Sequence, residues 1–325
     1  MFLKTKITEM LGIKYPIICG GMLWLAVPQL AAAISNAGGL GNITAGNYNN
    51  GEELREAIRQ TRQLTDHPFG VNITLLPSFR ISAETYDDFF RVCCEEEVAA
   101  IEVSGSPAQK YLDKVHAAGI KIFHKVGSVR HAIKIEELGY DGVFAAGIEE
   151  GGHPLNDDVS TIVLVPRIVD SVQIPVVATG GIADGRGLAA ALALGAEGVM
   201  MATRFINTQE CLAHDSIKRE FINRQETDTT LICKSLNLQG RALKNRLAEA
   251  VLESEARGAS LEEIFPLLSG QRSKEAWETG DVEDAAFMIG QSVGLIHDVP
   301  SCQELLDRMV REAEEILKGK SALFD

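Results

Sequence analysis

The sequence predicts an α/β protein with the (β/α)8 fold of a TIM barrel and an inserted helical lid domain. Three observations support this fold. Eight short apolar runs alternate with longer helical patterns over the first two-thirds of the 325 residues. Many of these runs are continuously apolar, as expected for parallel strands that are covered on both faces. A long stretch without a convincing strand follows the eighth run.

The eight predicted strands are short and are separated by turns rich in glycine and polar residues. We expect them at residues 16–19, 40–44, 70–75, 99–103, 121–125, 142–145, 175–178 and 198–201. Helices are expected between them at residues 28–37, 52–63, 108–117, 129–138, 164–171 and 187–194. No Gly-x-Gly-x-x-Gly motif follows the first strand, so the fingerprint of a dinucleotide-binding open sheet is missing. Eight such units therefore favour a closed barrel.

The last third of the chain has a different pattern. Residues 207–285 are predicted to be helical throughout, with helices at 214–224, 241–255 and 261–268. Two further helices, at 285–296 and 302–317, are expected to return to the barrel and complete it. The predicted domains are a barrel of residues 1–206 and 286–325 and a helical lid of residues 207–285.

Composition and charge narrow the range of partners. The net charge of −14 disfavours binding to nucleic acid or to an anionic membrane, because phosphates attract the opposite sign. The most apolar stretch, residues 188–201, is interrupted by Glu197 and is too short to span a membrane. The first residues lack the features of a secretory signal. Six cysteines without a CxxC pair indicate reduced thiols, and a cytoplasmic location is expected.

The turns after the seventh and eighth strands predict a phosphate site. Gly180 and Gly181 follow the seventh strand, and Ala202 and Thr203 follow the eighth. In many barrels these turns form a cup in which backbone N–H groups and the N-terminal end of the next helix face the phosphate oxygens. Thr203 adds a hydroxyl donor. A single Gly-Gly pair is more often only a tight turn, but two such turns on neighbouring strands predict a phosphorylated ligand.

Residues at three further strands extend this predicted site. The Gly20-Gly21-Met22 turn would let the backbone lie flat against a planar ring, and a turn packed on the barrel floor explains the glycines equally well. Asn72 lies in an apolar strand and needs a partner, which is either a ligand amide or phosphate or a neighbouring core group. Lys125, at the end of the fifth strand, either neutralises negative charge on a bound cofactor or extends to the surface.

His153 is the candidate catalytic residue. It follows two glycines on the loop after the sixth strand, and the ordinary pKa of imidazole suits proton transfer near neutral pH. A solitary histidine is more often structural, but the glycine-rich loop at the barrel mouth favours a catalytic role. No comparable setting surrounds the other histidines, except that His124 is ambiguous.

Three other polar or aromatic features lie near the predicted mouth of the barrel. Trp24, just past the first glycine turn, either forms the wall of a substrate pocket or is ordinary packing. Asp184 is predicted to be the N-cap of the helix after the seventh strand. The Glu149-Glu150 pair lacks the spacing of metal ligands, so no metal site is expected.

With these motifs the chain resembles the nitronate monooxygenase family, formerly called 2-nitropropane dioxygenases. The resemblance covers nearly the whole chain and rests on PIICGGM at 16–22, GVNITLLP at 70–77, HKVGSVRHA at 124–132, EEGGHP at 149–154 and ATGGIADGRG at 178–187. These proteins are FMN-binding TIM barrels related to the FMN-dependent enoyl-acyl-carrier-protein reductases. HPLNDD at 153–158 and the long insertion look more like the branch that includes bacterial NADH:quinone reductases.

The resemblance implies roles for individual residues and for the insertion. It makes His153 the catalytic histidine and residues 207–285 a lid that shapes the substrate cleft. The implied contacts to FMN are Gly21, Met22, Asn72, Lys125, Gly180, Gly181, Ala202, Thr203 and Gln291.

The resemblance also implies the reaction, with alternatives. The first expectation is an FMN-dependent oxidoreductase that oxidises alkyl nitronates with O2 to a carbonyl compound and nitrite. The alternative is an NADH:quinone oxidoreductase with the same FMN site, in which NADH is the reductant. An enoyl-acyl-carrier-protein reductase is less favoured, because this acidic chain has no evident basic dock for the carrier. A flavin-binding barrel without turnover is the non-enzymatic alternative, and the placement of His153 argues against it.

Overall fold

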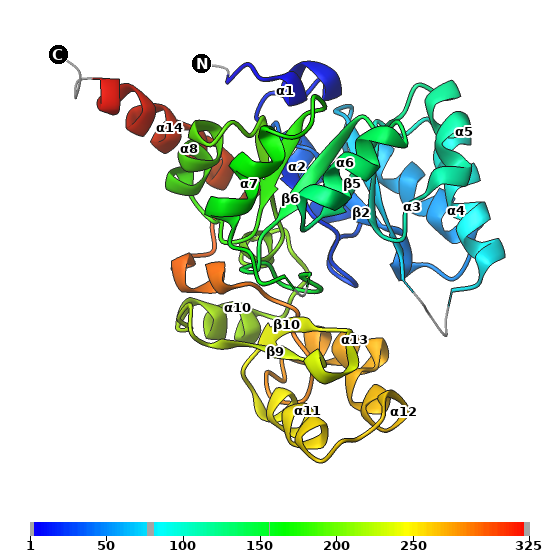
Figure 1. Ribbon diagram of the computed structural model, residues 1–325, viewed down its shortest axis with the longest axis vertical. Coiled ribbons are helices and arrows are strands. Elements are labelled where there is room, and N and C mark those ends of the chain that lie inside the picture. Colours follow the sequence, from blue (N-terminus) through cyan, green and yellow to red (C-terminus); the bar gives the residue numbers. More distant parts are fainter. Residues whose placement is uncertain (1–2, 77–80, 156, 322–325) are drawn as a thin grey trace.

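Eight parallel strands form one sheet in the computed structural model, which describes residues 3–76, 81–155 and 157–321 (Figure 1). The strands are β1 (Ile17–Cys19), β2 (Gly41–Thr44), β3 (Phe69–Leu75), β4 (Ala100–Gly105), β5 (Lys121–Val126), β6 (Gly142–Ala146), β7 (Val176–Thr179) and β8 (Gly198–Met201). They pair in the order β1-β8-β7-β6-β5-β4-β3-β2. A parallel bridge between Ile18 and Leu40 joins β1 to the start of β2 and closes the barrel. The predicted fold is confirmed.

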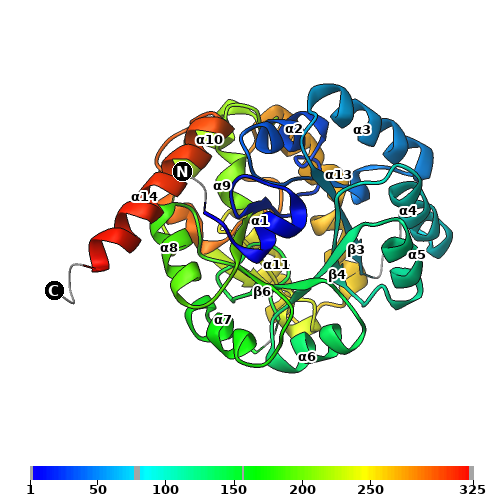
Figure 2. The ribbon, with the colours of Figure 1, turned by 90° about the horizontal axis from the view of Figure 1, so that it is seen from above.

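A ring of helices surrounds the barrel, as Figure 2 shows from above. The helices are α2 (Pro28–Asn36), α3 (Gly51–Leu64), α4 (Ala83–Glu95), α5 (Leu112–Ala117), α6 (Val129–Glu137), α7 (Thr161–Val169), α8 (Gly185–Ala193) and α14 (Cys302–Ser321). In α3, Asn50 accepts a hydrogen bond from the backbone N–H of Glu53 and caps the helix. The helix then buries Leu54 and Ile58, which lie on one face at a spacing of four residues.

The N-terminal helix α1 (Lys6–Leu11) closes one end of the barrel (Figure 2). Its residues Ile7 and Leu11 pack with Phe123 and Phe144, which point into the barrel from β5 and β6. The two phenylalanine rings lie 5.4 Å apart between centroids. Because α1 precedes β1, this apolar plug lies at the N-terminal ends of the strands. The carboxyl ends of the strands form the opposite, open end.

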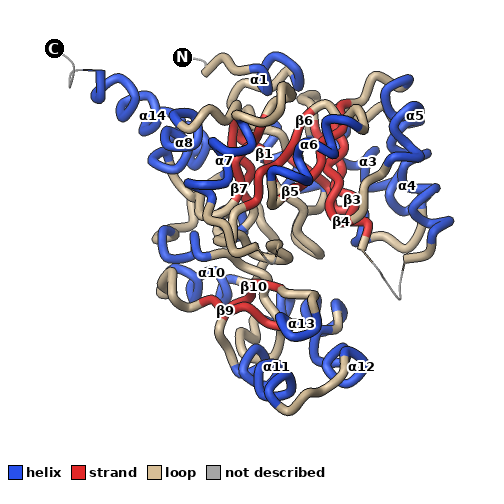
Figure 3. Tube along the Cα trace, in the orientation of Figure 1, coloured by secondary structure: helices blue, strands red, loops and turns tan. Residues whose placement is uncertain are grey.

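The lid region contains a β-hairpin as well as helices. Strands β9 (Thr229–Ile232) and β10 (Gly240–Leu243) pair antiparallel, and Figure 3 shows the two strands next to the lid helices. The helices are α10 (Asp215–Ile222), α11 (Arg246–Ala256), α12 (Leu261–Ile264) and α13 (Gly270–Thr279). The prediction that 207–285 is helical throughout is therefore wrong. Strands of only four residues give too little periodicity to be recognised, and α11 begins at Arg246 because Asn245 caps it.

The segment that returns from the lid to the barrel also differs from the prediction. Residues 285–290 are not helical, and only a 3-10 helix, η5 (Gln291–Leu295), follows. Gly290 and Gly294 lie in this segment, and both lower helix propensity. The predicted final helix is present as α14, which packs along α8. Pro77 and Asn156, which belong to two of the family motifs, lie outside the described residues.

Two further features concern the whole of the described chain. None of its helices is both long and apolar enough to cross a membrane. All six cysteines are free thiols, and five of them are buried.

Replacement of Gly41 by alanine tests the packing of α2 on β2. A β-carbon at Gly41 would lie 1.9 Å from the carbonyl oxygen of Ala31 in α2, so helix and strand would have to separate. We expect G41A to lower the free energy of unfolding by about 3 kcal/mol, as overpacked cores do. The control is G319A in α14, where the added methyl meets nothing within 4 Å. It is expected to stabilise by up to about 1 kcal/mol. Equal stability of the two variants in urea would contradict this packing.

Candidate functional site

A cavity lies at the carboxyl ends of the barrel strands, at the end opposite α1. It receives residues from β1, β4, β5, β6, β7 and β8 and from the segment that precedes α14. The residues that line it are Gly20, Gly21, Glu102, Lys125, Glu150, Gly151, Thr179, Gly180, Gly181, Ile182, Met200, Met201, Ala202, Thr203, Gly290 and Ser292. Six of the predicted site residues are among them, namely Gly21, Lys125, Gly180, Gly181, Ala202 and Thr203.

The turns after β7 and β8 offer hydrogen-bond donors to this cavity. Gly180 and Gly181 have φ angles of 102° and 73°, which only glycine adopts without strain. Within the described residues, the backbone N–H groups of Gly181 and Thr203 have no hydrogen-bond acceptor. The Thr203 hydroxyl accepts a bond from the N–H of Gly290 at 3.0 Å, so its own proton is available for donation. These three donors are the kind that a phosphate group needs.

The N-terminus of α8 is already occupied by carboxylates. Asp184 caps it as predicted, accepting from the N–H groups of Arg186 and Gly187 at 3.0 and 3.3 Å. Glu312 of α14 accepts from the N–H of Gly185 at 3.1 Å. The first N–H groups of α8 are therefore not available to a phosphate, contrary to the expectation from the sequence. The donors to a ligand come from the turns themselves.

The first glycine turn is fixed by protein contacts. The N–H of Met22 donates to the hydroxyl of Thr44 at 3.0 Å, and the Met22 side chain is buried. A β-carbon at Gly21 would lie 2.2 Å from the side-chain carbon of Asn72. Packing of Asn72 thus explains the glycine at position 21 without a ligand. The same turn still leaves bare backbone on the wall of the cavity, as a flat ring would require.

Glu102, which the sequence analysis overlooked, is the buried acid of this cavity. Its carboxylate accepts from the N–H of Gly21 at 3.0 Å and from the amide of Asn42 at 3.3 Å. The Asn72 side chain accepts from the hydroxyl of Thr74 at 3.4 Å and lies near enough to Glu102 to lower its pKa, so Asn72 has polar neighbours within the protein. Burial raises the pKa of Glu102 to about 7, against the lowering effect of the Lys125 charge. A glutamate inside the apolar run of β4 was the signal in the sequence.

Lys125 belongs to the cavity and is not a surface lysine. Its side chain is only 20% exposed, and its ammonium group lies 3.2 Å from the carboxylate of Glu150. Burial raises the pKa of Glu150, and the charge of Lys125 opposes that shift. The cavity therefore contains two buried carboxyl groups and one ammonium group.

His153 lies beside this cluster on the loop after β6. The His153 side chain is exposed at the mouth although protein surrounds the loop that carries it, and its ring makes no hydrogen bond to the described residues. Desolvation by this surrounding protein, and to a smaller extent the charge of Lys125, lowers the pKa of His153 to about 4. The ring is therefore neutral at pH 7 and can accept a proton. His124, by contrast, is buried and bonds to the carbonyl of Lys125 at 2.8 Å.

Trp24 and Gln291 lie at the junction between the barrel and the lid. Trp24 has an unusual positive φ of 69°, and its indole N–H donates to the carbonyl of Gly270 in α13 at 2.8 Å. It therefore links the first barrel loop to the lid and does not line the cavity itself. The N–H of Gln291 donates to the carbonyl of Glu149 at 2.9 Å, which ties η5 to the loop that carries His153.

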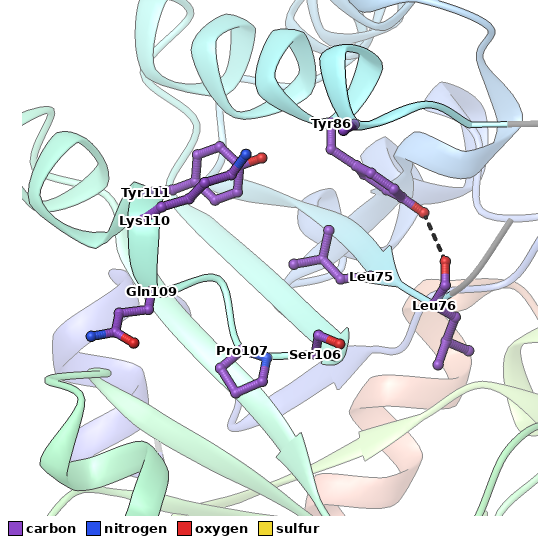
Figure 4. A pocket seen from close by; sticks show the side chains of 9 residues that line it. Leu75, Leu76, Tyr86, Ser106, Pro107, Gln109, Lys110 and Tyr111 are labelled. Carbon is purple, nitrogen blue, oxygen red and sulfur yellow. Dashed lines mark hydrogen bonds between the residues drawn. The ribbon is translucent and has the colours of Figure 1, made fainter.

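A second and larger cavity, of about 710 Å³, lies at the rim between the ends of β3 and β4 (Figure 4). Leu75, Leu76, Pro107 and two tyrosines line it. The hydroxyl of Tyr86 donates to the carbonyl of Thr74 at 2.9 Å. None of the predicted site residues lines this cavity, so we assign the chemistry to the smaller one. Within the described ranges, no group of three or more acidic, histidine or cysteine residues is placed to hold a metal ion.

Comparison with known proteins gives full-length matches. A family model described as nitronate monooxygenase matches residues 4–312. The (3aS,4S,5R,7aS)-5-hydroxy-7a-methyl-1-oxo-octahydro-1H-indene-4-carboxyl-CoA dehydrogenase of Rhodococcus jostii (strain RHA1) is 35% identical, with 99% of both chains covered. FabK from Thermotoga maritima has a TM-score of 0.92 and 38% identity, again with 99% of both chains covered. Nitroalkane oxidase from Streptomyces ansochromogenes has a TM-score of 0.82 and 27% identity over 96% of this chain and 99% of that one.

The raised pKa of Glu102 makes the stability of the ligand-free protein depend on pH. Between pH 4.5 and about 7 the folded state keeps the proton that the unfolded state releases, so stability falls as the pH rises. Relative to the E102Q variant, we expect the wild type to lose roughly 3 kcal/mol across this window. Urea unfolding at a series of pH values measures the difference. E56Q, at an exposed position in α3, is the control, and a pH-independent difference for E102Q would contradict the assignment.

Proposed function

The chain belongs to the nitronate monooxygenase family, and we propose that it is an FMN-dependent enzyme that oxidises alkyl nitronates with O2 to a carbonyl compound and nitrite. Its family and relatives identify it as an oxidoreductase. The observation that carries the proposal is the cavity itself. Free backbone donors at the ends of β7 and β8 share this cavity with Lys125, and a neutral histidine lies beside it on the loop after β6.

The donors and the bare backbone of this cavity support FMN as the cofactor. Its phosphate would be held by the N–H groups of Gly181 and Thr203 and by the Thr203 hydroxyl, with Gly180 and Ala202 completing the two turns. Its ring would lie against the Gly21 backbone. Beyond these five, the residues proposed around the ring are Met22, Asn72, Lys125 and Gln291. When bound, FMN supplies the capacity to accept electrons from the substrate.

His153 is proposed to handle the proton of the substrate. A neutral imidazole accepts the proton from the carbon next to the nitro group of a neutral nitroalkane. With a nitronate anion as substrate, the ring N–H of the same histidine donates a hydrogen bond to a nitro oxygen and orients it. The glycines before His153 let the loop approach the cavity closely. Trp24, which links barrel and lid, would limit the substrate space at the edge of the mouth.

Reduction of the flavin by NADH, with a quinone as acceptor, is the second candidate. The Rhodococcus relative is named as a dehydrogenase, and that name favours a hydride-transfer reaction on this fold. The same cavity would then receive the nicotinamide before the acceptor, and His153 would orient or protonate the quinone oxygen.

The role of Thr203 is tested by binding of FMN and riboflavin to the ligand-free protein. T203V removes the hydroxyl, and T203S retains it. We expect T203V to weaken FMN binding by about 10-fold or more, because a hydrogen bond to a charged group contributes about 1.5–3 kcal/mol. Riboflavin, which has no phosphate, should bind both variants and the wild type alike. Quenching of flavin fluorescence measures each dissociation constant, and equal losses for both flavins would exclude a phosphate contact.

Anaerobic mixing identifies the electron donor. The FMN-loaded enzyme is mixed with propyl 2-nitronate or with NADH, and the loss of flavin absorbance is followed. Bleaching by the nitronate supports the first reaction, and bleaching by NADH alone refutes it.

The role of His153 is tested by steady-state turnover of 2-nitropropane in air. H153A should retain FMN and lose about 100-fold or more in turnover, because general bases contribute rate factors of that size. H67A, at the opposite end of the barrel, is the control, and unchanged turnover in H153A would reject the histidine.

A further inference from the structure

The loop that carries His153 is held by two different parts of the molecule. This loop, residues 147–160, runs from β6 to α7, and the structure describes all of it except residue 156. The barrel fixes its first residue, because the N–H of Gly147 donates to the carbonyl of Thr179 in β7 at 3.0 Å, and the two ends of the loop are joined because the N–H of Ile148 donates to the carbonyl of Val159 at 2.9 Å. The middle of the loop, which contains His153, is attached to the lid.

The attachment begins with the backbone. Gly152 forms an antiparallel bridge with Arg241 of β10. The N–H of Arg241 donates to the carbonyl of Gly152 at 2.6 Å, and the N–H of Gly152 donates back at 3.2 Å. Gly152 thus adds a third strand position to the hairpin of β9 and β10. The residue directly before His153 is therefore fixed by the lid.

Two buried lid side chains hold loop residues before and after His153. The Gln239 amide donates to the carbonyls of Pro154 and Leu155 at 3.1 and 2.7 Å. The Arg241 guanidinium donates to the carbonyl of Ile148 at 2.9 Å. Gln239 is 3% exposed and Arg241 is 6% exposed, so both donors are shielded from water. Buried donors of this kind fix carbonyl positions more firmly than exposed ones.

Gln239 has a feature that stability alone does not explain. Its side-chain oxygen is buried and has no hydrogen-bond partner among the described residues. Such an oxygen costs free energy, which a methionine of similar size would not. The benefit of glutamine at this position is therefore in its two amide hydrogen bonds to the loop. The His153 ring makes no hydrogen bond to the described chain, so no hydrogen bond of its own holds the ring, and the anchored backbone on either side of it limits where the ring can lie.

We propose that the lid positions the proton-transferring group of this enzyme, and that Gln239 and Arg241 are the positioning residues for His153. This inference rests on the proton-transfer role proposed above for His153. Proton transfer requires the acceptor nitrogen to lie within hydrogen-bond reach of the substrate proton, and a misplacement of about 1 Å can cost about 100-fold in rate. The barrel thus supplies the binding cavity, and the lid sets the geometry of the proton acceptor.

The test begins with the Q239M variant of the FMN-loaded enzyme. We expect kcat with 2-nitropropane to fall about 10-fold while the dissociation constant of FMN stays unchanged, because the FMN contacts lie on the barrel. R246M is the matched control. Arg246 is an exposed lid residue that pairs with Asp284 at 3.1 Å and does not touch the loop. Its kcat should equal that of the wild type.

A double-mutant cycle separates positioning from general damage. If Gln239 acts through His153, the H153A variant should lose nothing more when Q239M is added. Independent, multiplicative losses would overturn the inference. An unchanged kcat in H153A would instead refute the proposed role of His153, which keeps the two failures distinct.

A titration that needs no substrate gives an independent readout. The pKa of His153 in the ligand-free protein is measured by NMR of the imidazole carbon protons, with H153A used for assignment. Release of the loop should move this pKa from about 4 toward the ordinary value of about 6.5, because the ring leaves its desolvated position. Q239M should show this rise and R246M should not. An unchanged pKa in Q239M would overturn the inference even if activity falls.

Discussion

The backbone bridge between Ile18 and Leu40 turns an eight-stranded sheet into a closed barrel, and the whole candidate site depends on that closure. Closure brings the carboxyl ends of all eight parallel strands to one mouth. The apolar plug formed by Ile7, Phe123 and Phe144 fills the other end, and the candidate site lies at the mouth. Residues from six strands, which are up to about 180 positions apart in the sequence, therefore share one small cavity.

The cavity contains more acidic than basic side chains, although an anion is proposed to bind there. Lys125 is the one ammonium group that lines it, and Glu150 lies against that ammonium group. The turns at Gly181 and Thr203, proposed above to hold a phosphate, offer it backbone N–H groups and a hydroxyl rather than a cationic side chain of their own. Burial raises the pKa of Glu102 to about 7, so this group carries only part of a negative charge near neutral pH.

The barrel could be predicted from the sequence because its strands are buried on both faces. Each predicted strand agrees with the structure to within two residues, since continuous apolar runs between glycine turns leave little ambiguity. The lid hairpin was missed because β9 and β10 have four residues each, and their pairing depends on contacts that no local pattern records. Similarly, Gly180 and Thr203 could be placed at one site from strand order alone. The approach of Glu102 to Gly21 could not, because a side-chain hydrogen bond across strands is a tertiary contact.

The pairing of Gly152 with Arg241 makes the lid and the β6 loop one structural unit, although about 90 residues separate them in the chain. Domain boundaries drawn at 207 and 285 would divide that unit. In this chain the lid is therefore not an independent module, because replacing it would also replace the backbone partner of Gly152. A chimera that joins a foreign lid to this barrel would also inherit a foreign third strand position beside its histidine. Any replacement lid would have to present a matching backbone edge to Gly152, so the inserted segment limits how the histidine loop can be redesigned.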